Sequence, residues 1–266
     1  MFKRVAYIFL FLSLLFLTIS CSKYQKLLKN SDHELKYEVA IGYFEQKDYF
    51  RALNLFEQVI AAYRGTSKVE EIYYYYAYCY YYQKDYLVAS YYFKRYAKNF
   101  PNNPRAEECL FMSAYCYYLD SPKYSLDQTN THEAIKELQL FINFFPDSER
   151  IETCNTLIDE LRGKLEKKDF EIAKLYLKTG HYKAAITAFN NILRDYPDTP
   201  NKEDILYYII KSYFNYAIYS VKDKQEERYQ AAIEAYNDFI YLFPKSEFTR
   251  DASNMHNNAW KQISKE

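Results

Sequence analysis

The stretch AITAFNNILRDYP, residues 185–197, carries the pattern that decides the fold. A small residue, Ala185, is followed by apolar residues four and seven positions later, then by an aromatic residue at position eleven and a proline. Residues spaced by three or four positions lie on one face of an α-helix, and proline ends a helix because it lacks a backbone donor. The stretch therefore predicts an amphipathic helix whose small residue lets a second helix approach closely.

The pattern occurs five times, beginning at Ala52, Ala89, Ala134, Ala185 and Ala232, at intervals of 37, 45, 51 and 47 residues. The proline follows in the last four copies. Four preceding helices are marked by an alanine with a tyrosine three positions later: Ala40 and Tyr43, Ala77 and Tyr80, Ala114 and Tyr117, Ala173 and Tyr176. These pairs resemble the tetratricopeptide repeat. We therefore expect an all-α fold, a right-handed solenoid of about five tetratricopeptide-like helix pairs with a C-terminal capping helix over residues 247–264.

Three segments depart from the repeat period. Eight extra residues between Ala114 and Ala134 predict a polar loop over residues 120–130, and a charged insertion lies near residues 222–227. Residues 150–179 contain no proline and predict one long helix. We expect an N-terminal half at residues 33–149, with repeats 1 to 3, and a C-terminal half at residues 150–266, with repeats 4 and 5 and the cap.

The first twenty residues have the composition of a lipoprotein signal peptide. Lys3 and Arg4 precede an apolar run over residues 5–19, which is short for a membrane span. The run ends in LTISC, residues 17–21, which resembles a bacterial lipobox except for Thr18, where leucine is usual. We predict that Cys21 is lipidated, that residues 21–32 form the lipidated tether, and that Ser22 directs the protein to the outer membrane, with its body in the periplasm. The alternative is an ordinary signal peptide with a coincidental cysteine.

Charge and reactive residues argue against several function classes. Without Lys3 and Arg4, 33 basic residues face 35 acidic ones, so no basic footprint for nucleic acid is present. Cys79, Cys109, Cys116 and Cys154 fall within helical patterns and are expected to be buried free thiols. The four histidines are scattered, and no phosphate-binding glycine loop occurs. We therefore expect no cofactor, no metal and no enzymatic activity.

Tyrosine is unusually abundant, with 33 residues. Most are expected in the core, including Tyr73, Tyr76 and Tyr80. Tetratricopeptide repeats expose defined first-helix positions on their concave surface, and aromatic residues there predict a groove for an apolar or aromatic peptide. These candidate peptide-binding residues are Tyr37, Phe44, Tyr74, Tyr78, Tyr81, Tyr82, Phe111, Tyr115 and Tyr118. In repeat 4 the equivalent positions include Lys167, Lys174 and Lys178, which we expect to bind a different partner unless they form only a solvated face.

Residues 127–199 resemble a particular lipoprotein family more closely. The resemblance rests on Asp127-Gln128-Thr129, on FPDS at residues 145–148, on AKLY at residues 173–176, and on DYPDT at residues 195–199. Their order and spacing are similar to those of the BamD (ComL/YfiO) lipoproteins of the outer-membrane β-barrel assembly machine. Leu126 and Glu149 depart from the family pattern, which often has arginine and tyrosine there.

Membership would imply a non-enzymatic adaptor. The resemblance implies contact with the periplasmic modules of a BamA-type barrel subunit through the C-terminal half. It also implies binding of unfolded outer-membrane protein precursors in the N-terminal groove, and attachment to the membrane through the N-terminal lipid. Two other readings remain open: another periplasmic tetratricopeptide adaptor, for example one that coordinates envelope division, and a nutrient-uptake lipoprotein resembling SusD, which would need about twice this length.

Overall fold

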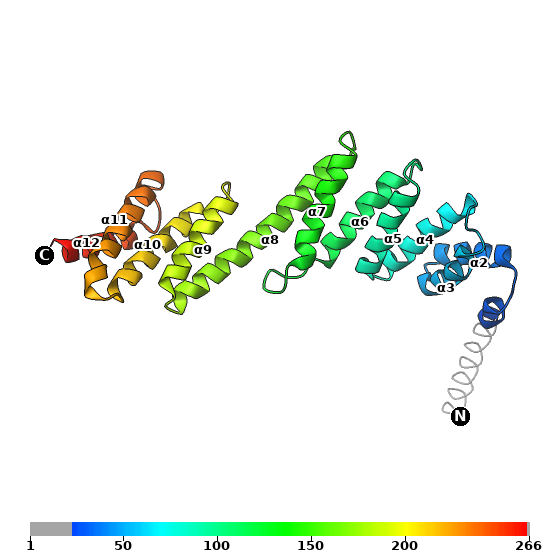
Figure 1. Ribbon diagram of the computed structural model, residues 1–266, viewed down its shortest axis with the longest axis horizontal. Coiled ribbons are helices and arrows are strands. Elements are labelled where there is room, and N and C mark those ends of the chain that lie inside the picture. The colour runs from blue at the N-terminus through cyan, green and yellow to red at the C-terminus, as the bar shows by residue number, and fades with distance from the viewer. Residues whose placement is uncertain (1–22, 265–266) are drawn as a thin grey trace, which may run out of the picture. The chain divides into compact units, whose positions relative to one another are not determined.

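The structure is a computed structural model that describes residues 23–264 (Figure 1). The predicted signal peptide and Cys21 lie outside the described residues. In the described part of the chain, five pairs of helices form the repeats: α2 (His33–Glu45) with α3 (Tyr49–Ile60), α4 (Lys68–Tyr82) with α5 (Tyr86–Asn99), α6 (Ala106–Asp120) with α7 (Thr129–Phe144), the end of α8 (Ile151–Lys178) with α9 (Tyr182–Asp195), and α10 (Lys202–Ile218) with α11 (Gln225–Leu242). The last described helix, α12 (Thr249–Ile263), packs on the last pair. The all-α architecture and the long helix α8 are confirmed. No described helix, over residues 23–264, is both long and apolar enough to cross a membrane.

The chain forms two compact units. The N-terminal unit contains the described residues up to Pro122 together with Thr129–Ile158, and the C-terminal unit contains Lys123–Gln128 and the residues from Asp159 onward. We expected the division at residues 149 and 150. The two compact units divide within α8, between Ile158 and Asp159. The loop of residues 123–128 belongs to the C-terminal unit, where Lys168 Nζ donates to the backbone oxygen of Leu126.

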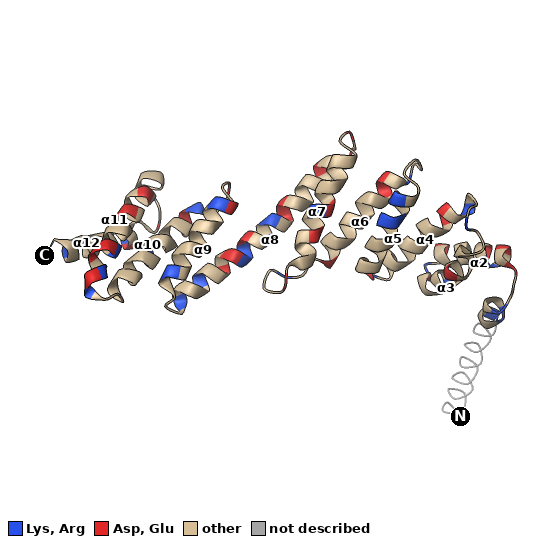
Figure 2. Ribbon diagram, in the orientation of Figure 1, with Lys and Arg blue, Asp and Glu red and all other residues tan. Residues whose placement is uncertain are grey.

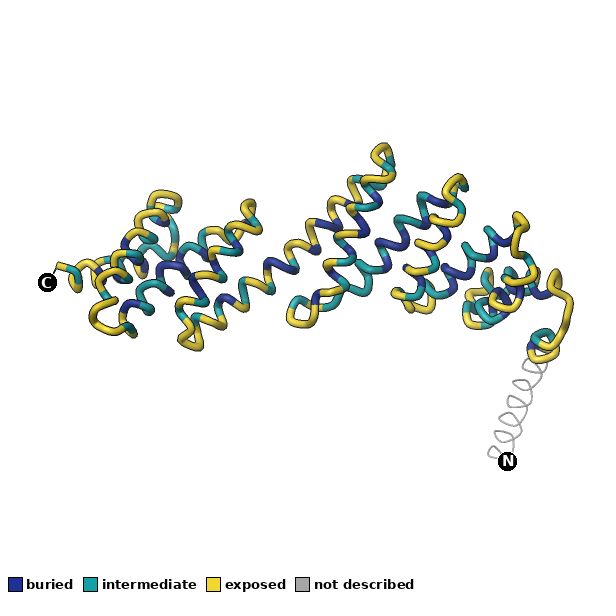
Figure 3. Tube along the Cα trace, in the orientation of Figure 1, coloured by how far each residue is buried: buried dark blue, intermediate teal, exposed yellow. Residues whose placement is uncertain are grey.

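The small residues of the repeat pattern lie in the core. Ala52, Ala89, Ala134, Ala185 and Ala232 are all buried, as are the first-helix alanines 40, 77, 114 and 173. Figure 3 shows that buried residues recur along the helices of both units. Large buried residues of the second helices, such as Phe56, Phe93 and Phe189, fill the space between the paired helices. The four predicted free thiols are also buried and unpaired, and burial raises the pKa of Cys79 and of Cys116 to about 12.

A recurring clasp closes three of the repeats. The residue two positions after the proline accepts a backbone N–H at the start of the next first helix: Asn103 from Arg105, Ser148 from Arg150 and Thr199 from Asn201. The same side chains donate to a glutamate in the first helix of their own repeat: Asn103 to Glu70, Ser148 to Glu107 and Thr199 to Glu166. Each clasp therefore joins the first helix of a repeat to the turn that follows its second helix. Glu70 and Glu107 lie in the first turns of α4 and α6, whereas Glu166 lies in the second half of the long helix α8.

Candidate functional site

The nine predicted peptide-binding residues lie on the first helices of the N-terminal unit. Tyr37 and Phe44 are on α2, Tyr74, Tyr78, Tyr81 and Tyr82 on α4, and Phe111, Tyr115 and Tyr118 on α6. Tyr82 is 46% exposed, whereas the other eight residues are half-buried. Beyond their opening turns, α4 carries no charged residue and α6 carries only Asp120 (Figure 2). The residues therefore form a packed aromatic face rather than a row of free side chains.

Hydrogen bonds between neighbouring repeats fix part of this aromatic face. Tyr37 Oη donates to Glu71 Oε2 at 2.7 Å, and Tyr74 Oη donates to Glu108 Oε1 at 3.0 Å. Tyr78 also donates to Glu108. Desolvation and the bond to Glu108 raise the pKa of Tyr74 to about 12, so its hydroxyl stays protonated and donates at neutral pH. The two carboxylates thereby hold the tyrosine rings of the preceding repeat in place.

The remaining aromatic residues stack in two groups. Tyr82 stacks on Tyr49 with ring centroids 4.6 Å apart, and its ring lies 6.0 Å from that of Phe44. On α6 the rings of Phe111 and Tyr115 are stacked 5.8 Å apart, and those of Tyr115 and Tyr118 5.7 Å apart. Aromatic rings favour further edge or offset contacts with rings of a ligand. The two stacks are thus suited to aromatic side chains of a bound peptide.

Tyr78 has a larger structural role than the sequence pattern suggested. Its ring contacts Phe93 of α5 edge-on, with centroids 4.8 Å apart, in addition to the hydroxyl bond to Glu108. Burial, more than this bond, raises the pKa of Tyr78 far above its usual value. Tyr78 therefore supports the packing of α4 on α5, and Tyr81 and Tyr82 are the better residues for testing peptide binding.

The three predicted partner-binding lysines lie in the C-terminal unit. Lys167 is exposed, and its ammonium lies 4.7 Å from the centroid of the Tyr124 ring. Lys174 lies 3.6 Å from a carboxylate oxygen of Glu171 and 5.3 Å from the centroid of Phe170. Lys178 is exposed. The structure brings Lys174 and Lys178 together in one hollow and places Lys167 outside its lining.

This basic hollow has a volume of about 690 Å³ between α8 and α10. Its lining includes Lys174, Lys178 and Lys211, together with the apolar side chains of Leu175 and Leu177 and the ring of Tyr208. Glu171 is the acidic residue of the lining. Ammonium groups above aromatic and apolar walls suit a partner segment that presents carboxylates beside apolar side chains.

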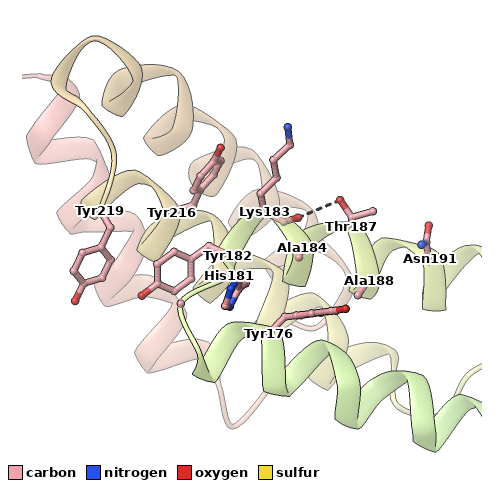
Figure 4. Close-up of a pocket in the computed structure, with 11 residues that line it drawn as sticks. Tyr176, His181, Tyr182, Lys183, Ala184, Thr187, Ala188, Asn191, Tyr216 and Tyr219 are labelled. Atoms are coloured by element: carbon pink, nitrogen blue, oxygen red, sulfur yellow. Dashed lines mark hydrogen bonds between the residues drawn. The ribbon is translucent and has the colours of Figure 1, made fainter.

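A second hollow, of about 790 Å³, lies where α8 ends and α9 begins (Figure 4). Tyr176, Tyr182, Tyr216 and Tyr219 are among the residues that line it, and Tyr182 stacks on Tyr219 with centroids 5.6 Å apart. Tyr219 is largely exposed. The hollow is wide open and mostly uncharged, so it offers contact area for another protein rather than an enclosed ligand site.

Sequence reasoning missed three features of these surfaces. It did not identify Glu71 and Glu108 as acceptors for the tyrosine hydroxyls, although each follows its partner by 34 residues. It did not mark the first helix of repeat 5, in which buried Ser212 occupies the small position, 20 residues before Ala232. The same separation joins Ala114 to Ala134 and could have revealed it. Lys211 lies in the same helix, so it was not recognised as a third lysine of the basic hollow.

Comparison with known proteins gives one family match. The model of the YfiO family, described as an outer membrane lipoprotein, matches residues 29–228. The outer membrane protein assembly factor BamD of Caulobacter vibrioides is 24% identical over 132 residues, which cover 50% of this chain and 40% of that protein. BamD of Buchnera aphidicola is 28% identical over 101 residues, covering 38% of this chain and 41% of that protein. Each match spans about two fifths of the relative's length.

Solved structures of repeat proteins are also similar. A tetratricopeptide repeat protein from Bacteroides fragilis is 15% identical, with a TM-score of 0.39, and the match covers 88% of this chain and 100% of that one.

Proposed function

Because this chain belongs to the YfiO family of outer membrane lipoproteins, we propose that it is a non-enzymatic adaptor in the assembly of β-barrel proteins into the outer membrane. Relatives named as BamD assembly factors support the proposal. The observation that carries it is the aromatic face of α2, α4 and α6, whose tyrosines are held by Glu71 and Glu108.

The aromatic face is the proposed site for unfolded barrel precursors. An unfolded segment supplies apolar and aromatic side chains without a fixed shape, and rigid tyrosines bind such segments with little loss of side-chain entropy. Tyr82 is exposed and the rings stacked along α6 are half-buried, so both keep ring surface that a ligand can contact. We assign precursor C-terminal segments to it, because an aromatic end residue can pack against these rings.

The C-terminal unit is the proposed site for a BamA-type barrel subunit. The basic hollow with Lys174, Lys178 and Lys211 supports contact with an acidic surface of the subunit's periplasmic modules. Lys167, exposed outside the hollow lining, is assigned to the same partner. Acylation of Cys21 would hold both units at the periplasmic face of the outer membrane, since two or three acyl chains anchor almost permanently.

A pull-down of the lipidated protein from its native envelope tests the proposal. We expect recovery of a barrel protein with periplasmic modules, and loss of that partner when Lys174→Glu and Lys178→Glu are combined. The matched control is Lys202→Glu with Lys245→Glu, two exposed lysines of the same unit outside the hollow. Recovery of cell-division proteins without a barrel subunit would favour the alternative adaptor role and reject the proposal.

A further inference from the structure

The N-terminal end of the described chain is fixed to repeat 1. Residues 23–28 are helical, and the Tyr24 side chain is only 7% exposed. The Tyr24 ring packs edge-on against Tyr43, with centroids 5.8 Å apart, and its hydroxyl lies 3.5 Å from the backbone oxygen of Arg51. Leu27 and Leu28 pack on the same core cluster. The segment is therefore part of the folded repeat.

A buried lysine fastens the other end of this segment. Lys36 of α2 is 5% exposed, and its Nζ donates to the Leu28 backbone oxygen at 3.1 Å and to Gln58 Oε1 at 2.7 Å. A cation at the carboxyl end of a helical segment satisfies a carbonyl that has no helical partner. The segment is thus held at both ends, by Tyr24 and by Lys36.

This attachment limits the distance between repeat 1 and the proposed lipid anchor. Three peptide units separate Cys21 from Tyr24, and fully extended chain spans at most about 11 Å over them. That is about the diameter of one helix with its side chains. If Cys21 is acylated, the backbone of Tyr24 lies within about a helix diameter of the lipidated residue. The first turn of α3, which the Tyr24 hydroxyl contacts, lies about one tyrosine side chain further away.

The residues at this end have the chemistry of a membrane-binding surface. Lys23, Lys26 and Lys29 are exposed, and residues 23–31 contain no acidic residue. Phe50, in the first turn of α3, is 66% exposed and adjoins Arg51, which Tyr24 contacts. Exposed Lys47 lies in the turn just before it. The nearby Asp48 is already paired with Arg51 at 3.0 Å.

We propose that repeat 1 docks on the membrane itself. The lysines of residues 23–29 and Lys47 bind anionic lipid headgroups, and Phe50 enters the interfacial layer. We assign the bilayer to this surface because Cys21, the proposed anchor, is only three residues from Tyr24, whose side chain is buried in repeat 1. The inference rests on the proposed acylation of Cys21. Beyond that anchor, the docking would hold the protein in a fixed orientation, with repeat 1 against the membrane surface.

Tryptophan quenching by lipid tests this docking. The full acylated chain carries Trp260→Phe, to remove the only native tryptophan, and either Phe50→Trp or Phe144→Trp. Phe144 is the matched control, because it is 65% exposed and lies in the same unit, on α7 of repeat 3. The protein is reconstituted into vesicles of phosphatidylethanolamine and phosphatidylglycerol that contain brominated acyl chains.

We expect about twofold stronger quenching at position 50 than at position 144, because interfacial side chains enter the bilayer by about 5–10 Å. Combining Lys23→Gln, Lys26→Gln and Lys29→Gln should remove most of the difference, as should phosphatidylcholine vesicles without anionic lipid. Equal quenching at both positions in protein that sediments with vesicles would overturn the docking while leaving the anchor intact. Protein that fails to sediment would overturn the anchor and the docking together.

Discussion

The hydroxyl of Tyr74 donates to the carboxylate of Glu108, 34 residues further along the chain. Tyr37 and Glu71 have the same separation and the same bond. In both cases a tyrosine of one repeat is held by a glutamate in the first turn of the next first helix. The aromatic face of the N-terminal unit therefore depends on the register between consecutive repeats.

Removal of the shared acceptor should destabilise this unit. Glu108→Ala leaves the hydroxyls of Tyr74 and Tyr78 without their carboxylate partner, at an expected cost of about 1–3 kcal/mol. Chemical denaturation monitored by circular dichroism measures the loss. Glu152→Ala, at an exposed position in the first turn of α8, is the control and should have little effect. Equal stability of the two variants would show that the Tyr–Glu bonds contribute nothing to folding.

The same bonds predict sensitivity to alkali. The pKa of Tyr74 is raised from 10.0 to about 12 in the folded protein, by desolvation first and by Glu108 second. The folded state holds this proton more tightly, so its stabilisation is complete below pH 10 and is lost as the pH rises through about 12. Tyrosinate absorbance and helicity followed over this range should change together. Tyr74→Phe should make stability less dependent on pH there, and an unchanged profile would contradict the assignment.

The buried alanines between paired helices should not tolerate replacement by larger side chains. Ala89→Leu and Ala185→Leu each force a branched side chain into a fully buried contact between paired helices, with an expected cost of about 1–3 kcal/mol. Ala61→Leu, at an exposed helix end, is the control. Thermal melts compare the three variants, and unchanged melting temperatures for both buried positions would mean that the helix register is wrong.

Precursor binding should depend on Tyr81 and Tyr82 at the C-terminal end of α4. Tyr81→Ala with Tyr82→Ala removes two rings at about 2 kcal/mol of hot-spot energy each, so a synthetic precursor C-terminal peptide should bind at least about tenfold more weakly. Isothermal titration calorimetry measures the affinity, and helicity should be retained. Tyr91→Ala, an exposed tyrosine of second helix α5, should bind normally. Loss of the barrel subunit instead of the peptide would reject the assignment of partners to the two units.

Cys21 is predicted to be the membrane anchor. Cys21→Ala should release the protein into the soluble periplasmic fraction while its helicity and melting temperature stay unchanged, because the repeat pattern begins downstream. Cell fractionation with immunoblotting measures the distribution. A variant that still sediments with outer membranes would show that protein partners, rather than lipid, hold it there.

The alanine pattern predicted the fold because the spacing of small and apolar residues along the sequence indicates which helix faces pack together. Ala52, Ala89 and Ala185 were expected where paired helices approach closely, and each is fully buried. Contacts between repeats were harder to predict, since the Tyr74–Glu108 bond depends on how consecutive pairs stack. The loop of residues 123–128 was recognised as polar, but its attachment to Lys168 depends on tertiary structure alone. Ser212 was missed because repeat 5 replaces the expected alanine.

The clasp of repeat 3 has a consequence for how such chains acquire new contacts. Glu107 binds Ser148 although eight additional residues separate α6 from α7. The bond fastens the pair at the end opposite the α6–α7 connection, so that connection can lengthen without loosening the helices. Insertions are therefore tolerated best at the edge of the repeat that carries the connection between its two helices. A longer loop on that edge can gain a contact of its own, as residues 123–128 do with Lys168, while the clasped edge keeps the spacing that lets the next repeat stack.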